Sequence, residues 1–420
     1  MNNIFKIKGK SPLQGEVEIS GSKNAALPIL AASLIISGKS KIKNVPLISD
    51  VKNFLNILSF LGVKIDQKGN DIKLNSNSLK SIIDINHEGI EKMRAAILLL
   101  GPLLARIGEV KIPFPGGCVL GKRSIFSHLF AFEQIGIEVL ESKRFIHLKQ
   151  GKNFLKTNKI ILPEMSVTAT ENILIFLSFF EKEVEVRMCA SEPHVQNLCQ
   201  FLKNSGAKIS GIGSSTIKIK GGNLKNGQIT VTPDMLEVGT FIIASSITNG
   251  NVLIKNVDHD HLDSFYQKLN EVGVNFTLKP KAIKVTPSNK FKAVDFKTAV
   301  FPGFSTDLMA PFVVLLTQAK GVSRVFETLF EGRFAFLIEL EKMGARSEIL
   351  NPHNAIIIGK TPLKGSYVAS QDIRAGAAVT LAALAAKGES KISNINYIFR
   401  GYENFTEKLQ SLGADIYIDT

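Results

Sequence analysis

A cysteine in a glycine-rich loop is the first candidate for chemistry in this chain. Cys118 lies in the segment Pro113-Phe-Pro-Gly-Gly-Cys-Val-Leu-Gly-Lys-Arg123. The glycines let the backbone approach a ligand closely, and the two cations at the end of the segment favour a thiolate and attract an anionic substrate. Cys118 is therefore a candidate acid or nucleophile, and the alternative interpretation is a buried free cysteine beside a turn.

A second group of candidates lies near the N-terminus. Lys23 and Asn24 come shortly before Pro28, a residue favoured in the first turn of a helix, so both are expected where a helix N-terminus receives an anion. The alternative interpretation is an N-cap for Asn24 and a solvated side chain for Lys23.

Two carboxylates precede apolar runs in the second half of the chain. Asp307 comes directly before residues 308–318, and Asp372 comes just before residues 374–386. Each is either a helix cap or a functional acid, and the two roles are compatible.

A repeated unit organises the elements that position these residues. A helical apolar pattern ends at a small-residue turn that contains glycine, and a strand follows. The turns recur at intervals of 67 to 74 residues, at Gly62, Gly136, Gly206, Gly273, Gly344 and Gly413. Six copies of one βα unit are indicated, and two bundles of three such units make two domains.

Six further helices are predicted to be apolar on nearly every side, over residues 25–36, 95–105, 173–180, 239–247, 308–318 and 375–386. A helix of this kind must be buried on every side. The pattern therefore favours helices inside and sheets outside, rather than a doubly wound fold.

Composition limits the class of protein and its partners. The 420 residues are 45% hydrophobic and 21% charged, which is typical of a globular protein of two domains. No segment has the length of a membrane span or of a signal-peptide core, and three scattered cysteines indicate a reducing compartment, so we expect a cytoplasmic protein with no membrane partner. The net charge of +14 suggests anionic partners, but no basic arm indicates nucleic acid.

Motifs along the whole chain resemble the UDP-N-acetylglucosamine enolpyruvyl transferases. The matching segments are 13–28, Met93-Arg-Ala95, Pro115-Gly-Gly-Cys118, Ser166-Val167, Thr306-Asp307, Phe330-Glu-Gly-Arg333, Asp372-Ile-Arg-Ala375 and Arg400–Leu409. The resemblance implies a two-domain inside-out α/β barrel with three repeats in each domain. It places residues 22–229 in the domain that carries the Cys118 loop, and residues 1–21 and 230–420 in the domain that carries Asp307 and Arg400.

The resemblance also implies a reaction. The family transfers the enolpyruvyl group of phosphoenolpyruvate to the 3-hydroxyl of UDP-N-acetylglucosamine by addition and elimination, which releases phosphate and begins peptidoglycan synthesis for the cell wall. No metal or other cofactor is implied, the small-molecule substrates are the expected partners, and a monomer is the expected state.

Site residues follow from the same resemblance. Cys118 is the acid or covalent nucleophile and the target of fosfomycin, Asp307 is the base at the sugar hydroxyl, and Asp372 supports the reacting centre. Phosphoenolpyruvate is bound by Lys23, Asn24, Arg123, Arg374 and Arg400. UDP-N-acetylglucosamine is bound by Asn24, Arg94, Arg123, Ser166, Val167, Asp307 and Leu329.

The chain departs from the family pattern where the nucleotide is expected to bind. Phe126 replaces an aspartate, Glu164 replaces a common lysine, Thr168 replaces a glycine, and Met235 stands where an arginine is frequent. The changes at Glu164 and Thr168 weaken anion binding on paper, and Phe126 removes a side-chain hydrogen-bond partner. Phe126 and Thr168 therefore suggest one alternative, a paralogue that keeps the fold without efficient turnover.

Two further alternatives belong to other classes of function. The first is the shikimate-pathway enolpyruvyl transferase, although its own phosphate motifs do not occur in this chain. The second is a basic nucleic-acid-binding protein built from the same βα repeat. Metal binding by Asp258–Asp263 is not expected, because consecutive loop residues cannot all face one ion, and Cys189, His194 and Cys199 lack a paired second motif for zinc.

Overall fold

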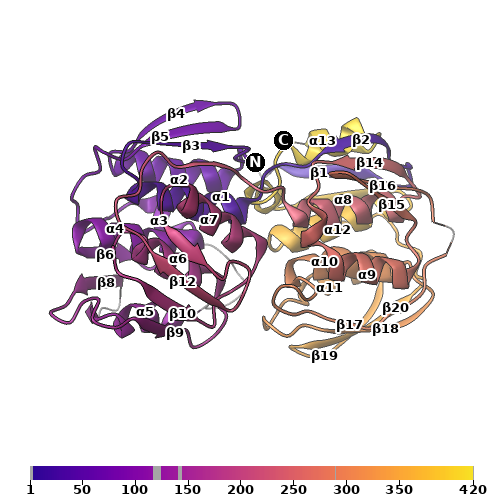
Figure 1. Ribbon diagram of the computed structural model, residues 1–420. Coiled ribbons are helices and arrows are strands. Elements are labelled where there is room, and N and C mark those ends of the chain that lie inside the picture. Colours follow the sequence, from indigo (N-terminus) through magenta and orange to yellow (C-terminus); the bar gives the residue numbers. More distant parts are fainter. Residues whose placement is uncertain (1–2, 117–123, 141–143, 289, 420) are drawn as a thin grey trace. The chain divides into compact units, whose positions relative to one another are not determined.

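A computed structural model of the chain describes residues 3–116, 124–140, 144–288 and 290–419 (Figure 1). These residues form two compact units, each named here after one candidate residue. The Lys23 unit comprises residues 21–116 and 124–232, and the Asp307 unit comprises residues 3–20 and 233–419. Cys118 and Arg123 lie outside the described residues.

In the Lys23 unit the helices are α1 (Lys23–Ala32), α2 (Ser49–Phe60), α3 (Glu88–Glu91), α4 (Leu100–Ile107), α5 (Phe126–Gln134), α6 (Val167–Leu177) and α7 (Pro193–Asn204), with the 3-10 helices η1 (Ser33–Ile35) and η2 (Arg94–Leu99). Its strands are β3 (Lys39–Lys43), β4 (Lys64–Lys68), β5 (Asp71–Asn75), β6 (Glu109–Pro113), β7 (Ile137–Leu140), β8 (Phe145–Gln150), β9 (Lys159–Ile161), β10 (Val184–Arg187), β11 (Lys208–Ser210), β12 (Thr216–Lys220) and β13 (Gln228–Thr230).

In the Asp307 unit the helices are α8 (Met235–Ile247), α9 (Asp263–Val272), α10 (Thr306–Thr317), α11 (Phe336–Lys342), α12 (Ile373–Ala385) and α13 (Phe405–Ser411), with the 3-10 helices η3 (His259–His261) and η4 (Ile395–Arg400). Its strands are β1 (Ile4–Lys8), β2 (Gln14–Glu18), β14 (Asn251–Lys255), β15 (Phe276–Lys279), β16 (Ala282–Val285), β17 (Phe296–Lys297), β18 (Gly321–Phe326), β19 (Arg346–Asn351), β20 (Asn354–Gly359), β21 (Tyr367–Ala369), β22 (Glu389–Ser393) and β23 (Asp415–Asp419).

The six expected copies of one unit are present among the described elements. In five copies an apolar helix is followed by a strand, an amphipathic helix and two further strands; in the sixth, β23 follows α13 and the N-terminal strand β1 takes the place of the second of these strands. Among the named strands, the first strand of five copies also pairs with a parallel strand from elsewhere in the chain. Sheets β13-β3-β5-β4 and β2-β14-β16-β15 show this order in the two units. The N-terminal strands β1 and β2 complete sheets of the Asp307 unit, where β1 pairs with both β22 and β23 (Figure 1).

The three apolar helices of each unit lie at its centre, inside three sheets (Figure 1). In the Asp307 unit α8, α10 and α12 pack against one another, and each unit has its own hydrophobic core. Every residue of α10 from Leu308 to Thr317 is buried, and every residue of α12 from Arg374 to Ala385 is buried. The prediction of an inside-out α/β arrangement is therefore confirmed.

The six turn glycines have the conformation that the sequence predicts. Each follows the C-terminus of an amphipathic helix with φ between +81° and +117°, a region that L side chains rarely adopt. One expectation about helix starts is wrong. Pro28 lies inside α1, which begins at Lys23 and has Ser22 as its N-cap, so Pro28 does not belong to the first turn and Asn24 is not the cap.

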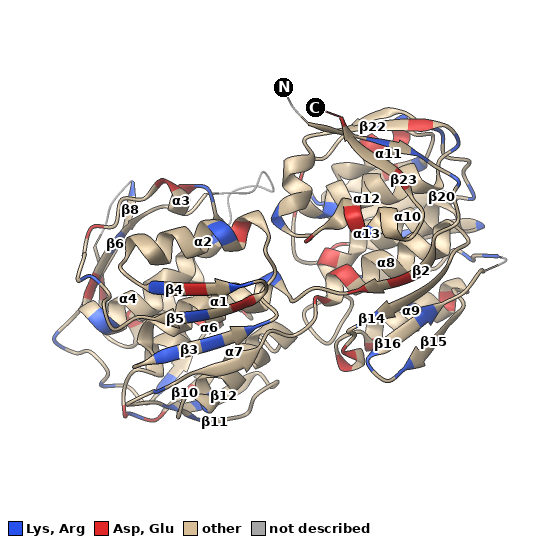
Figure 2. Cartoon of the chain, turned by 90° about the horizontal axis from the view of Figure 1, so that it is seen from above, with Lys and Arg blue, Asp and Glu red and all other residues tan. Residues whose placement is uncertain are grey.

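Lysine and arginine are dispersed over both units, on strands such as β3 and β5 as well as on loops (Figure 2). Across the part of the chain that the structure describes, no helix combines the length and the apolar character needed to cross a membrane.

Candidate active site

Several of the candidate residues lie at the N-termini of the central helices. In the Asp307 unit the first two residues of α10 are Thr306 and Asp307, and Arg374 is the second residue of α12. The apolar stretches of these helices form the core, and the charged side chains lie where the helices begin. The backbone N–H groups of a first helical turn lack partners in the helix, which makes these positions suited to anions.

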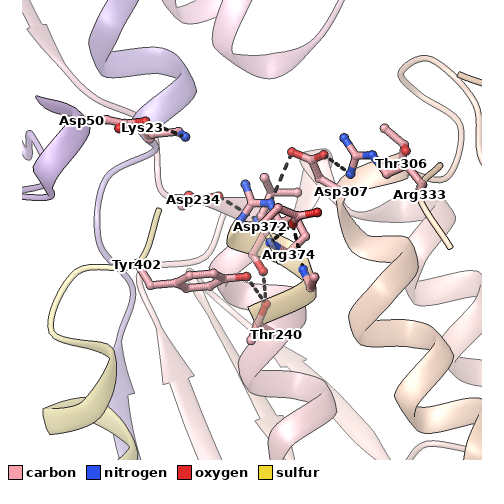
Figure 3. Close-up of polar contacts among 12 residues, drawn as sticks. Lys23, Asp50, Asp234, Thr240, Thr306, Asp307, Arg333, Asp372, Arg374 and Tyr402 are labelled. Carbon is pink, nitrogen blue, oxygen red and sulfur yellow. Dashed lines mark hydrogen bonds and ion pairs between the residues drawn. The ribbon is translucent and has the colours of Figure 1, made fainter. Parts of the chain in front are cut away.

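Asp307 lies between two arginines (Figure 3). Its Oδ1 is 2.8 Å from Nη1 of Arg333, and its Oδ2 is 3.4 Å from Nε of Arg374. The Asp307 side chain keeps 26% of its surface exposed, whereas the two arginine side chains keep only 8% and 9%. The two guanidinium groups therefore fix the orientation of a carboxylate that stays accessible.

Arg374 is a buried cation surrounded by acceptors. Its guanidinium carbon lies 5.5 Å from the ring centre of Tyr402, whose hydroxyl is 2.9 Å from Oγ1 of Thr240. Burial disfavours the charged guanidinium, but Tyr402, Asp307 and Asp234 outweigh burial and raise the pKa of Arg374 above its ordinary value. Arg374 thus stays charged in the interior.

Both arginines keep unused donors. The buried atoms Nη1 of Arg374 and Nε of Arg333 have no hydrogen-bond partner among the described residues. An unsatisfied donor in the interior costs free energy, so a charged acceptor that reaches these atoms is stabilised. The cluster therefore has capacity for an anionic group beyond the Asp307 carboxylate.

The two aspartates differ in their relation to the helix ends. Asp372 caps α12, since its Oδ1 accepts hydrogen bonds from the backbone N–H of Arg374 at 2.7 Å and of Ala375 at 2.9 Å. Asp307 does not cap α10, because Ser305 is the N-cap residue. The capping interpretation therefore holds for Asp372 and is wrong for Asp307.

A buried carboxylate holds the segment that supplies Leu329 and Arg333. Glu327 is fully buried; its Oε2 accepts from Oγ1 of Thr306 at 2.7 Å, and its Oε1 accepts from the backbone N–H of Leu329 at 2.9 Å and of Phe330 at 3.1 Å. The start of α10 and the loop that follows β18 are thereby joined. Leu329 itself is 40% exposed.

In the Lys23 unit the first residue of α1 forms an ion pair. Nζ of Lys23 lies 3.3 Å from Oδ2 of Asp50, in the first turn of α2, and both side chains are largely buried. Asn24 is the second residue of α1 and is half-buried. Pro28 lacks an N–H group, so the backbone carbonyl of Asn24 does not receive the usual helical hydrogen bond.

The remaining candidates lie at the ends of other helices, three of them in the same unit. Arg94 begins η2 and donates from Nη2 to the backbone carbonyl of Ser124 at 2.8 Å. Ser166 is the N-cap residue of α6 without a side-chain cap bond, and Val167 is the first residue of that helix. Arg400 is the half-buried last residue of η4 in the Asp307 unit.

The departures from the family pattern contact other side chains near the start of α6. Oγ of Ser127 donates to Oε1 of Glu164 at 2.5 Å, and Nε2 of His128 lies 3.0 Å from Oγ1 of Thr168. Phe126 is 55% exposed and its ring lies 5.4 Å from that of Phe130.

Several residues of these clusters were missed by reasoning from sequence. Arg333 was part of a recognised motif without a role, and Asp50, Asp234, Thr240 and Tyr402 were not singled out. The motif Phe330-Glu-Gly-Arg333 is the available signal for Arg333, and the matching segment Arg400–Leu409 contains Tyr402; the other three depend on contacts between distant segments.

In the two segments whose composition resembles a metal site, the side chains have other partners or lie in the core. Nδ1 of His259 lies 2.9 Å from the hydroxyl of Tyr266, and Nε2 lies 2.8 Å from the carbonyl of Lys279. Cys189 and Cys199 are buried in the core, and burial raises the pKa of each thiol to about 12. Among the residues described, no group of three or more metal-ligating side chains is found.

Comparison with known proteins defines the class first. The family model described as EPSP synthase (3-phosphoshikimate 1-carboxyvinyltransferase) matches residues 7–409. The structure is similar to that of the enolpyruvyl transferase NikO from Streptomyces tendae, with a TM-score of 0.89, 23% identity and coverage of 100% of this chain and 99% of that chain. It is also similar to EPSP synthase from Acinetobacter baumannii, with a TM-score of 0.79, 18% identity and full coverage of both chains. The fold is that of the enolpyruvyl transferases.

Sequence relatives then narrow the class to one family. UDP-N-acetylglucosamine 1-carboxyvinyltransferase from Halothermothrix orenii is 41% identical over 413 residues, which are 98% of each chain. The enzymes of the same name from Campylobacter fetus and Helicobacter pylori are 42% and 40% identical over 420 residues, with coverage of 99% of this chain and 99% and 98% of theirs. The chain belongs to the UDP-N-acetylglucosamine 1-carboxyvinyltransferase family.

Proposed function

We infer that the protein is a transferase that moves the enolpyruvyl group of phosphoenolpyruvate to the 3-hydroxyl of UDP-N-acetylglucosamine and releases phosphate. Relatives about 40% identical over nearly the whole chain carry this activity in their names and favour it over the shikimate and nucleic-acid alternatives. The arrangement that supports the chemistry is the accessible Asp307 carboxylate held between Arg333 and Arg374. The reaction is the first committed step of peptidoglycan synthesis.

Addition to phosphoenolpyruvate needs a base at the attacking hydroxyl. We assign this role to Asp307, because its orientation is set by two arginines while its surface stays accessible. Asp372 acts differently: its Oδ1 caps α12, so it supports the reacting centre by fixing the start of the helix that carries Arg374.

The same addition needs an acid for the methylene carbon, and we assign this role to Cys118. The assignment rests on the family resemblance of its loop. The cations that follow it in the sequence, Lys122 and Arg123, favour the thiolate, so Cys118 also serves as a nucleophile toward electrophilic ligands.

Phosphoenolpyruvate carries a phosphate and a carboxylate, and both need cations. We assign their binding to Lys23, Asn24, Arg123, Arg374 and Arg400. Arg374 has a buried donor ready for such a group, and the planar guanidinium matches a carboxylate or a phosphate through paired hydrogen bonds.

We assign the binding of the nucleotide sugar to Asn24, Arg94, Arg123, Ser166, Val167, Asp307 and Leu329. Ser166 and Val167 stand where the backbone N–H groups of α6 are available to a diphosphate. We propose that residues 22–229 act as one domain and residues 1–21 with 230–420 as the other, in a monomeric cytoplasmic enzyme that uses no metal or organic cofactor.

Phosphate release tests the proposed function directly. The purified protein is incubated with phosphoenolpyruvate and either UDP-N-acetylglucosamine, shikimate 3-phosphate or no acceptor. We expect phosphate only with the nucleotide sugar, because its 3-hydroxyl is the attacking group. Equal release with shikimate 3-phosphate, or no release with any acceptor, contradicts the proposal.

A further inference from the structure

A buried glutamate joins the start of α10 to the loop that follows β18. Glu327 is fully buried directly after that strand. On one side its Oε2 accepts a hydrogen bond from Oγ1 of Thr306 at 2.7 Å. On the other side its Oε1 accepts from the backbone N–H of Leu329 at 2.9 Å and of Phe330 at 3.1 Å. The two oxygens of one carboxylate therefore hold two segments that are distant in the sequence.

Both segments lead to the same ion pair. Thr306 is the residue before Asp307 in the first turn of α10. The ring centre of Phe330 lies 4.7 Å from the guanidinium carbon of Arg333, and Nη1 of Arg333 lies 2.8 Å from Oδ1 of Asp307 (Figure 3). Glu327 thus holds a neighbour of each member of the pair.

The backbone that carries this carboxylate is itself fixed. The N–H of Glu327 donates to the carbonyl of His353 at 2.9 Å, and the carbonyl of Glu327 accepts from Nδ1 of His353 at 2.7 Å. Thr328 next to it bonds twice to Thr298, from its N–H to Oγ1 at 2.9 Å and from its Oγ1 to the carbonyl at 2.8 Å. The loop therefore starts from a rigid base, and the Glu327 side chain extends from it in a defined direction.

The Glu327 carboxylate is held by neutral donors. In the described part of the chain it forms no ion pair. A negative charge that is buried without a cation costs free energy, whereas an apolar side chain at this position would leave three donors without an acceptor. The arrangement is therefore better explained by the geometry that it imposes than by a gain in stability.

We propose that Glu327 is a positioning residue of the transfer reaction, which sets Asp307 and Arg333 in the geometry that the base requires. The inference rests on the proposed function. A general base acts over hydrogen-bond distance, so a small displacement of its carboxylate slows the reaction. The property of Glu327 that matters for this role is its reach across two segments, and its charge is secondary.

Two substitutions separate reach from charge. Glu327→Gln keeps the length: its oxygen can accept from both backbone N–H groups, and its amide can donate to Oγ1 of Thr306. Glu327→Asp keeps the charge but is one methylene shorter, so it cannot contact both segments. We expect kcat of Glu327→Gln to stay within about 3-fold of the wild type and kcat of Glu327→Asp to fall about 10-fold or more. A Glu327→Asp variant at least as active as Glu327→Gln overturns the proposal.

The other end of the contact gives a test that leaves Glu327 in place. Thr306→Val removes the hydroxyl at nearly constant size; we expect kcat to fall about 10-fold, KM for both substrates to stay within about 3-fold, and Thr306→Ser to keep most of the activity. Thr317→Val is the matched control, because this threonine lies at the opposite end of α10 and donates to the carbonyl of Val314 at 2.7 Å. It should lower the melting temperature without a comparable loss of kcat. A Thr306→Val variant with the kcat of the wild type, or with the same loss as Thr317→Val, contradicts the positioning role.

Nitrogen-15 NMR distinguishes failure of this inference from failure of the proposed function. The Nε signal of Arg333, identified by its absence from Arg333→Lys, reports how freely the guanidinium group rotates. We expect slow rotation in the wild type and in Glu327→Gln, and faster rotation in Glu327→Asp. An unchanged signal in Glu327→Asp rules out the positioning of Arg333 whatever the activity. A wild-type protein that releases no phosphate overturns the proposed function, and the NMR comparison then decides by itself whether Glu327 sets the ion pair.

Discussion

In the Asp307 unit a carboxylate lies between two arginines, whereas in the Lys23 unit Lys23 pairs with a single carboxylate, Asp50, and neutral groups surround the start of α6. Arg333 and Arg374 retain buried donors without partners among the described residues. In the Lys23 unit, by contrast, neutral groups form the hydrogen bonds from Asn172 to His128 and between His128 and Thr168. The same repeat therefore supports two kinds of helix terminus. One holds charged side chains, and the other holds neutral hydrogen-bonding groups.

The largest effect is expected from the carboxylate in the Asp307 unit. Asp307→Asn removes the proposed base, and we expect kcat to fall by roughly 10²- to 10⁴-fold, the usual contribution of general base catalysis. Steady-state assays give kcat, and calorimetry checks that the nucleotide sugar still binds. Asp415→Asn, at an exposed position of the same unit, is the control and should change neither quantity. Full activity of Asp307→Asn would remove the carboxylate from the mechanism.

A comparably large effect is expected at Cys118. Fosfomycin, an epoxide-bearing phosphonate, should alkylate Cys118 selectively, because the other two thiols are buried and their pKa values are raised to about 12, so they carry almost no thiolate at neutral pH. Cys118→Ser should lose most turnover, since a hydroxyl is a much weaker acid than a thiol.

Peptide mass spectrometry after inhibitor treatment locates the label. Cys118→Asp should block alkylation while retaining an acidic proton for turnover. Label distributed evenly over Cys118, Cys189 and Cys199 would show that Cys118 is an ordinary thiol.

The sequence predicts the architecture well because its strongest signals follow from burial and from backbone geometry. A helix that is apolar on every side has to be central, and a glycine after an amphipathic helix has to accept positive φ; Gly62 and its five counterparts do so. The helix starts are predicted less well. The apolar run 239–247 marks the body of α8, but that helix begins at Met235, where the pattern is no longer uniformly apolar.

The site was only partly predictable for the same reason. Several candidate residues lie at helix starts, and a polar residue before an apolar run gives no sign of its partner. Asp307 and Arg333 are 26 positions apart, yet their atoms meet at 2.8 Å. Likewise, the replacements Glu164 and Thr168 read separately as losses of anion binding, but the structure shows each in contact with a residue of the 124–128 segment.

An intermediate effect is expected at Arg333. Arg333→Gln removes the charge that faces Oδ1 of Asp307 but keeps a polar side chain, so the carboxylate loses one of its two orienting partners. We expect kcat/KM to fall by about 10- to 100-fold, as for loss of one charge-assisted hydrogen bond. Arg333→Lys should recover only part of this loss, because an ammonium group lacks the planar pair of donors. Equal activity of Arg333→Gln and wild type would show that Arg374 alone orients Asp307.

The smallest effects on activity are expected from one buried glutamate in each unit, Glu237 in the Asp307 unit and Glu171 in the Lys23 unit. Glu237 accepts from Nζ of Lys408 at 2.6 Å and from the backbone N–H of Ser20 at 2.9 Å; burial nevertheless raises its pKa to about 7. Glu171 is 1% exposed with Glu192 nearby, and burial, with the charge of Glu192, raises its pKa well above the ordinary value.

For both groups the folded state holds a proton that the unfolded state has lost, so the free energy of unfolding falls as pH rises above the unfolded value. The Glu237 contribution should fall between about pH 4.5 and pH 7 and then level off. The pKa of Glu171 is also raised, so its contribution should fall as pH rises above the unfolded value, and Glu171→Gln should gain stability relative to wild type over that rise, by up to about 1.4 kcal/mol per pH unit. Glu237→Gln should instead lose stability at pH 8, because Lys408 is left without its carboxylate. Denaturant unfolding at pH 5, 6, 7 and 8 measures both variants, and the same pH profile for the two would show that the units do not differ in how they hold a buried acid.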